Sequence, residues 1–174
     1  MKDAVVRAHK ASAQGTRLAA AIVTASDTRT AADDASGSAL AEGLAAAGIA
    51  VVDRRIARDD VLALAHAIRA GIAAGADAVL VTGGTGIAPR DVTPEALVAL
   101  GARALPGFGE LFRALSFAEI GTAAMLSRAT AGIVGRTVVF ALPGSPGACR
   151  LALSRLILPE LPHLVAQLKK GPAS

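Results

Sequence analysis

Three aspartates in short polar stretches are the residues best suited to chemistry in this sequence: Asp27 in SDT, Asp59 in RDD and Asp91 in PRD. Carboxylates repel a phosphate unless a cation lies between them. Mg²⁺ is typically held by one or two carboxylates together with substrate oxygens. The three side chains therefore imply a magnesium ion if the ligand of this protein is a phosphate.

The stretch TGGTGIAPRDVTPEAL, residues 82–97, combines glycines, a carboxylate and the start of a helix. The apolar run before it has no polar alternation and predicts a strand that is covered on both faces. Thr93 is the expected cap of the following helix, Pro94 suits its first position, and Glu95 complements the positive end of its dipole. Asp91 is then not needed for capping. A strand, a glycine-rich turn, a spare carboxylate and a helix N-terminus are the parts of an anion site.

Two other stretches carry hydroxyls and glycines that can hold phosphate oxygens, SDT at 26–28 and PGSP at 143–146. In an open parallel sheet, ligands bind outside the carboxyl ends of the strands. Four polar loops are expected at that edge of the sheet: residues 26–28, 58–60, 83–91 and 143–146.

Most of these features also have a purely structural explanation. Asp59 and Ser145 can each cap the helix that follows, which is worth about 1 kcal/mol. The glycines can serve a tight turn and nothing more. Asp91 is the residue that such explanations cover least well.

The elements that must position these loops are predicted by an alternation of strands and helices. Buried strands are expected over residues 18–26 and 77–82, and a strand with charged residues at its end over residues 49–57. A helix follows each of the three strands, at 36–48 after the first, after Asp59-Asp60 for the middle one and from 94 after the last. Ser36 and Gly48 are the expected cap and stop of the first helix. Three strand-helix units predict a largely parallel sheet with helices on both faces.

The alternation changes after Pro106. Two short helices are expected next, with a break around Ser116 to Gly121. The segments ATAGIV and TVVFALPG, joined by Gly-Arg, predict a hairpin at one side of the sheet. The final stretch predicts a helix interrupted at Pro159 and Pro162.

Composition indicates one domain, residues 17–174, preceded by an N-terminal arm, residues 1–16. A hydrophobic content of 53% against 18% charged residues excludes general disorder and favours self-association. The longest charge-free segment, residues 137–149, contains two prolines and a glycine, so no membrane span is expected. With no secretory signal in the N-terminal residues, a soluble cytoplasmic protein is expected.

Several other classes of function are disfavoured. The net charge is +4, but the arginines are dispersed and the only aromatics are four phenylalanines, so a nucleic-acid partner is not expected. The chain has neither the P-loop nor the dinucleotide-binding fingerprint, and GSPG is not a nucleophile elbow. Cys149, the one cysteine, is expected in the core. The three histidines are expected to have solvent-facing or packing roles.

Four motifs in the order TASDT, RDD, TGGTGIAPRDVTPEAL and LPGSPGACR resemble the MoaB/Mog family of molybdenum cofactor biosynthesis proteins. The resemblance spans about residues 17–165, and the segments FRALSFAEIGTAAMLSRA and HLVAQLKK look most like the MoaB branch. It implies a three-layer α/β/α sandwich with a mostly parallel central sheet and an antiparallel edge hairpin. It also implies assembly as a homotrimer or homohexamer.

Members of this family bind molybdopterin, a pterin dithiolene with a terminal phosphate. Its active members transfer AMP from Mg-ATP to that phosphate and release pyrophosphate. Asp59 and Asp91 match the functional aspartates, so they are the expected catalytic residues and Mg²⁺ ligands. The expected substrate-binding residues are Ser26, Asp27, Thr82, Gly83, Gly84, Thr85, Gly86, Ser127, Pro143, Gly144 and Ser145.

A second hypothesis uses the same pocket without catalysis. In it, the protein is a non-enzymatic oligomer that holds molybdopterin or passes it to a partner, and it needs no ATP. Adenylylation of the pterin and binding without turnover are therefore the two functions to be distinguished.

Overall fold

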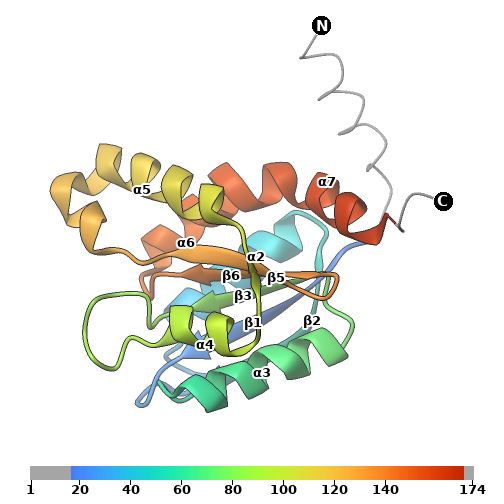
Figure 1. The fold of residues 1–174 in the computed structure, drawn as a ribbon, viewed down its shortest axis with the longest axis horizontal. Helices are drawn as coiled ribbons and strands as arrows, with labels where there is room; N and C mark the ends of the chain where they lie inside the picture. The colour runs from blue at the N-terminus through green and yellow to red at the C-terminus, as the bar shows by residue number, and fades with distance from the viewer. Residues whose placement is uncertain (1–16, 171–174) are drawn as a thin grey trace, which may run out of the picture.

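The computed structural model describes residues 17–170, and the predicted N-terminal arm lies outside the described residues. Its centre is a six-stranded sheet with the order β2-β1-β3-β6-β5-β4 (Figure 1). The strands are β1 (Ala19–Ala25), β2 (Ala50–Ala57), β3 (Ala78–Thr82), β4 (Arg103–Ala104), β5 (Thr130–Val134) and β6 (Thr137–Leu142).

Four neighbouring strands, β2, β1, β3 and β6, run parallel, whereas β5 and β4 pair antiparallel at one side. The runs AVLVT of β3 and TVVFAL of β6 are buried at every position, as expected for strands that are covered on both faces. The predicted hairpin is confirmed: β5 and β6 are joined through Gly135, whose φ of 60° suits glycine. The two-residue strand β4 was not predicted.

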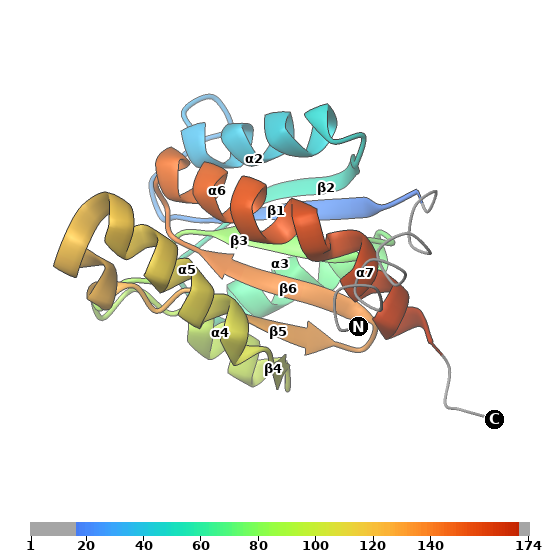
Figure 2. The same ribbon diagram turned by 90° about the horizontal axis from the view of Figure 1, so that it is seen from above.

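Helices cover both faces of the sheet (Figures 1 and 2). One face carries α2 (Ala35–Ala46), α5 (Pro106–Ile120), α6 (Pro146–Ala152) and α7 (Leu158–Lys169), and the other carries α3 (Val61–Ala73) and α4 (Thr93–Ala99). Alternate residues of β1 supply the two cores, because Ile22 packs with the first helix layer and Val23 with the second. The predicted three-layer α/β/α sandwich is confirmed.

Two predicted helix caps are wrong. The cap of α2 is Asp34, not Ser36, because the Asp34 carboxylate accepts the free amide of Gly37 at 2.9 Å. At α4, Val92 occupies the cap position and Thr93 is already helical. The Thr93 hydroxyl donates instead to the Gly83 carbonyl at 2.8 Å, so this threonine anchors the glycine-rich loop.

The predicted break between two helices is confirmed at Gly121, the last residue of the expected range, whereas the predicted interruptions of the C-terminal helix are wrong. Helix α5 continues through Ser116 and ends only before Gly121, whose φ of 62° starts the 3₁₀ segment η1 (Gly121–Leu126). The C-terminal helical run continues from α6 through the π segment η2 (Leu153–Ile157) into α7. Pro159 is the second residue of α7, directly after the π segment, and the helical run continues past it. Pro162 lies within α7 without ending it.

Candidate functional site

The four polar loops predicted from the sequence do lie at one edge of the sheet. They follow β1, β2, β3 and β6, which all run in the same direction, so their carboxyl ends coincide. Two adjoining compartments are found there, of about 420 Å³ and 240 Å³. Gly84, Asp91 and Gly144 line both of them, so the two form one branched site.

The larger compartment is mainly apolar. Phe112, Ile120 and Ala124 from α5 and η1 form one wall, together with the hydroxyls of Ser116 and Ser127. The opposite wall consists of the glycine-rich loop and the loop after β6. The predicted residues that line this compartment are Gly83, Gly84, Thr85, Gly86, Asp91, Ser127, Pro143, Gly144 and Ser145.

The smaller compartment is polar and charged. The carboxylates of Asp27, Asp59 and Asp91 line it together with Arg29 and Arg90. Ser26 lines it too, and its hydroxyl accepts the amides of Thr28 and Arg29 at 3.2 and 3.1 Å. The three aspartates that the sequence singles out therefore line one compartment, although they come from three loops.

The glycines of the loop do more than make a turn. Gly83 and Gly84 have φ values of 100° and 64°, which disfavour any side chain. A Cβ atom at Gly83 would lie 2.6 Å from the Ala25 carbonyl oxygen. At Gly86, whose φ is ordinary, it would lie 2.6 Å from the carboxylate of Asp91. The loop is thus shaped to pack on β1 and to leave room for Asp91.

Neither catalytic candidate is required as a helix cap. Asp60, not Asp59, caps α3 by accepting the amide of Ala63 at 2.8 Å. Asp91 accepts the amide of Ala88 at 2.9 Å and so orients its carboxylate within its own loop. The structural explanation left open for Asp59 is therefore wrong, whereas that for Ser145 is confirmed, because Ser145 caps α6.

Mutual repulsion makes this wall suited to a cation. Desolvation raises the pKa of Asp59, the charges of Asp27 and Asp91 raise it further, and Arg90 opposes the rise. A divalent cation bound beside these groups would relieve the repulsion, and hard carboxylate oxygens are the ligands that Mg²⁺ prefers. Within residues 17–170, no three acidic, histidine or cysteine side chains converge closely enough to hold a metal by themselves. The donors present fit Mg²⁺ that keeps other oxygen ligands.

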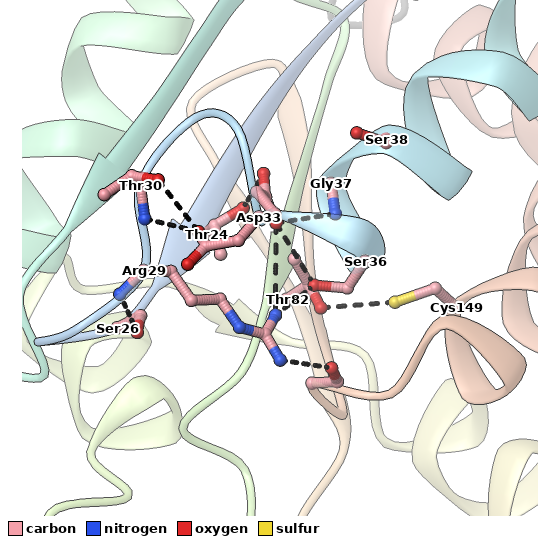
Figure 3. Close-up of polar contacts among 12 residues, drawn as sticks. Thr24, Ser26, Arg29, Thr30, Asp33, Ser36, Gly37, Ser38, Thr82 and Cys149 are labelled. Atoms are coloured by element: carbon pink, nitrogen blue, oxygen red, sulfur yellow. Dashed lines mark hydrogen bonds and ion pairs between the residues drawn. The ribbon is translucent and has the colours of Figure 1, made fainter.

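Thr82 is the predicted site residue whose side chain lies outside both compartments. It is fully buried, and its hydroxyl donates to the Pro143 carbonyl at 3.0 Å. Cys149, confirmed as a core residue, lies 3.2 Å from the same hydroxyl (Figure 3). Thr82 therefore supports the loop after β6 and does not line the pocket.

Sequence reasoning missed several residues that shape the site. Asp34 is buried beside it and binds Thr24, Arg54 and Gly37. Gly37 packs closely on it, since a Cβ atom there would lie 2.0 Å from the Asp34 carboxylate. Arg128, next to the predicted Ser127, was also missed. No pattern within the chain marks the pocket residues Phe112 and Ser116.

The fold and the site together define a class of protein: an α/β/α domain with a glycine-lined acidic pocket at the carboxyl edge of its parallel strands. The sequence matches the family described as "Probable molybdopterin binding domain" over residues 21–163, and the chain belongs to this family. The resemblance stated from the motifs is confirmed.

Named relatives agree with this assignment. The Molybdenum cofactor biosynthesis protein B of Bacillus subtilis (strain 168) is 49% identical over 151 residues, which cover 86% of this chain and 89% of the relative. The protein of the same name from Bacillus anthracis is 52% identical with the same coverage. Both support a role in molybdenum cofactor biosynthesis.

Solved structures show the same fold. A crystal structure of Molybdenum cofactor biosynthesis protein B has a TM-score of 0.84 at 50% identity, covering 88% of this chain and 96% of that chain. The tungsten cofactor synthesizing protein MoaB from Pyrococcus furiosus has a TM-score of 0.81 at 37% identity, with 89% of this chain and 99% of that chain covered.

Among the described residues, no helix has both the length and the apolar character needed to cross a bilayer.

Proposed function

We propose that this protein is a molybdopterin adenylyltransferase, which transfers AMP from Mg-ATP to the terminal phosphate of molybdopterin and releases pyrophosphate. One observation carries the proposal. Asp59 and Asp91, from the loops after β2 and β3, line one polar compartment that joins a larger apolar one at Gly84 and Gly144. Such a site can hold an aromatic ring system and a cluster of phosphates side by side.

The two compartments suit different parts of the substrates. The apolar one offers Phe112 and Ile120 as surfaces for a pterin, with the Ser116 and Ser127 hydroxyls as polar contacts. The polar one offers carboxylates for a metal ion and arginines for phosphate oxygens. The phosphate that links the two substrates would lie between them, beside Gly84 and Gly144.

The transfer needs little covalent chemistry from the chain. An oxygen of the molybdopterin phosphate attacks the α-phosphorus of ATP, and the bond from that phosphorus to the bridging oxygen of pyrophosphate breaks. No general base is needed, because the attacking phosphate is already ionised. The amides and hydroxyls of the glycine-rich loop orient the phosphates. Asp59 and Asp91 would hold Mg²⁺, which supplies neutralisation of the charge on the phosphates.

A carrier is the second candidate, and the structure favours it in one respect. The apolar compartment can accept a pterin without the carboxylates of Asp27 and Asp59, which lie outside it. Incubation of the purified protein with molybdopterin, ATP and Mg²⁺ separates the two functions. AMP-linked pterin, identified by mass spectrometry, supports the transferase. Pterin binding without turnover supports the carrier and refutes the transferase.

Asp91→Asn is the sharper probe of the assigned role. It keeps the shape of the side chain but removes the charge, so the rate should fall on the order of 100-fold, as for loss of one stabilising group in a transition state. Molybdopterin binding, measured by fluorescence, should change little. A variant that adenylylates at the wild-type rate would refute the role of Asp91.

We further propose that the protein assembles as a homotrimer or homohexamer. Among the described residues, five of the nine large apolar side chains that are exposed lie on α5 and η1, which supports this proposal: Leu111, Phe117, Ile120, Met125 and Leu126. Light scattering coupled to size exclusion measures the assembly directly. A monomer at micromolar concentration would contradict the proposal.

A further inference from the structure

Arg128, just before β5, binds the glycine-rich loop at three backbone carbonyls. Its Nε donates to the Gly86 carbonyl at 2.7 Å, and its Nη2 donates to the carbonyl of Asp91. Its backbone amide donates to the carbonyl of Thr85 at 2.8 Å. Residues 87–90 between these points are exposed. One residue therefore holds both ends of the exposed segment 87–90, which leads to Asp91.

Glu95 fixes the orientation of this guanidinium. Its two carboxylate oxygens accept from Nη1 and Nη2 of Arg128, and it lies in the first turn of α4. The bond from Arg128 lowers the pKa of Glu95, so the charged carboxylate is favoured at this position. The side chains are 37% and 48% exposed, and pairs so exposed contribute little to stability. The main effect of this pair is therefore expected on the geometry of the loop and not on the stability of the fold.

Glu95 also balances the positive charge of Arg128, which binds the backbone carbonyl of Asp91. One oxygen of the Asp91 carboxylate is held by the Ala88 amide, and the residue lines both compartments.

We propose that Arg128 and Glu95 are a positioning pair: Arg128 fixes both ends of the loop that leads to Asp91, and Glu95 holds the guanidinium in the orientation that reaches both carbonyls. The effect on loop geometry is independent of the reaction. The effect on catalysis rests on the proposed adenylylation.

Hydrogen exchange tests the loop without any substrate. The amide of Ala88 donates to the Asp91 carboxylate, and the amide of Asp91 donates to the Ala88 carbonyl. In Arg128→Gln, both amides should exchange at least about 10-fold faster than in the wild type, which corresponds to about 1.4 kcal/mol of lost protection. Arg55→Gln is the matched control, because Arg55 pairs with Asp53 through two 2.7 Å bonds on β2 and is 38% exposed. Unchanged exchange at Ala88 and Asp91 in Arg128→Gln would overturn the proposal.

Kinetics tests the second half. Arg128→Gln should lower kcat by about 100-fold with little change in the KM for ATP, because a displaced Asp91 acts in the transition state. Glu95→Gln should raise the Mg²⁺ concentration needed for half-maximal rate, and Arg55→Gln should do neither. Arg128→Lys keeps the charge but cannot reach both carbonyls, so its rate should be intermediate; it replaces Arg128→Gln if that variant does not fold.

The outcomes remain separable. If the wild type makes no AMP-linked pterin, the proposed function fails and the exchange rates alone decide the positioning role. If the wild type turns over and a folded Arg128→Gln keeps its rate, the effect of the pair on catalysis is refuted while the function stands.

Discussion

The aspartates at the carboxyl edge of the sheet fall into two groups with opposite surroundings: Asp34 alone is the structural group, and the aspartates that line the polar compartment are the site group. Asp34 is 1% exposed, yet its carboxylate is bonded by Thr24 and Arg54 at 2.9 Å each. Burial opposes its ionisation, but the bonds from Arg54, the Gly37 amide and Thr24 outweigh burial and lower its pKa. Asp59 is less buried, and its pKa is raised instead, by desolvation and by Asp27. A carboxylate with partners inside the chain supports structure, whereas one surrounded by other carboxylates is ready for an external cation.

Arg29 links the surroundings of Asp34 to the wall of the site, and Figure 3 shows it beside Ser36. Its guanidinium donates to the Ser36 hydroxyl at 2.8 Å, next to Asp34, and to the Gly144 carbonyl at 3.4 Å. Gly144 lines both compartments. The structural group therefore supports the wall of the site without supplying a ligand to it.

The largest expected effect is a loss of stability on substitution of Asp34, which the aspartates of the polar compartment should not share. Asp34→Ala removes a helix cap and leaves the Thr24 hydroxyl and the Gly37 amide without their acceptor. The free energy of unfolding should fall by about 3 kcal/mol, from about 1 for the cap and the rest for unsatisfied buried groups. Urea unfolding measures this. A loss as small as that of a surface substitution would place Asp34 in the same class as Asp59.

Asp59→Asn should show the reverse pattern. Removing a charge that is repelled by Asp27 and Asp91 should leave the free energy of unfolding unchanged or raise it by about 0.5 kcal/mol. Under the proposed function Asp59 holds the cation, so adenylylation should fall on the order of 100-fold. Parallel unfolding and activity assays test both halves. A destabilised variant with full activity would reverse the assignment of Asp59.

Gly86→Ala should perturb the site more gently. The added Cβ would meet the end of the Asp91 side chain, which can rotate away, and the backbone at Gly86 has an ordinary φ. Stability should change by under about 0.5 kcal/mol, while the rate should fall about 10-fold through displacement of the carboxylate. Gly84→Ala is the contrasting variant, since its positive φ and contact with Thr93 predict a loss of stability. Equal stability losses in the two variants would refute this account of the loop.

The sequence predicts the sheet and the four loops well, because their signals are local. Apolar runs such as AVLVT specify buried strands, and the direction of parallel strands then places the loops together. This is why Asp59 and Asp91 meet as expected.

Choices between equally suitable local partners could not be predicted. Both Asp34 and Ser36 can cap α2, and the choice depends on Arg54 of β2, 20 positions away. Thr93 can cap α4 but bonds to the glycine loop. Arg128 acts on carbonyls and on a carboxylate 33 to 42 positions earlier in the chain. Such contacts depend on tertiary packing, which residue types alone do not determine.

The smallest expected effect compares the two groups by pH. The lowered pKa of Asp34 contributes stability that is present above the ordinary value of 3.8 and is lost as the pH falls through the folded value. The raised pKa of Asp59 acts in the opposite sense: its contribution is complete below 3.8 and is lost as the pH rises through the folded value. Stability should therefore peak near the ordinary value as far as these two groups are concerned.

Urea unfolding of the wild type and Asp59→Asn across this range isolates the second contribution. The wild type should lose about 0.3 kcal/mol more than the variant as the pH rises above 3.8, a small difference because Asp59 is partly solvated. Added Mg²⁺ should remove the difference at neutral pH, since a bound cation favours the charged carboxylate. A difference of opposite sign would mean that Asp59 is stabilised in its charged form, like Asp34, and that the two groups of aspartates are alike.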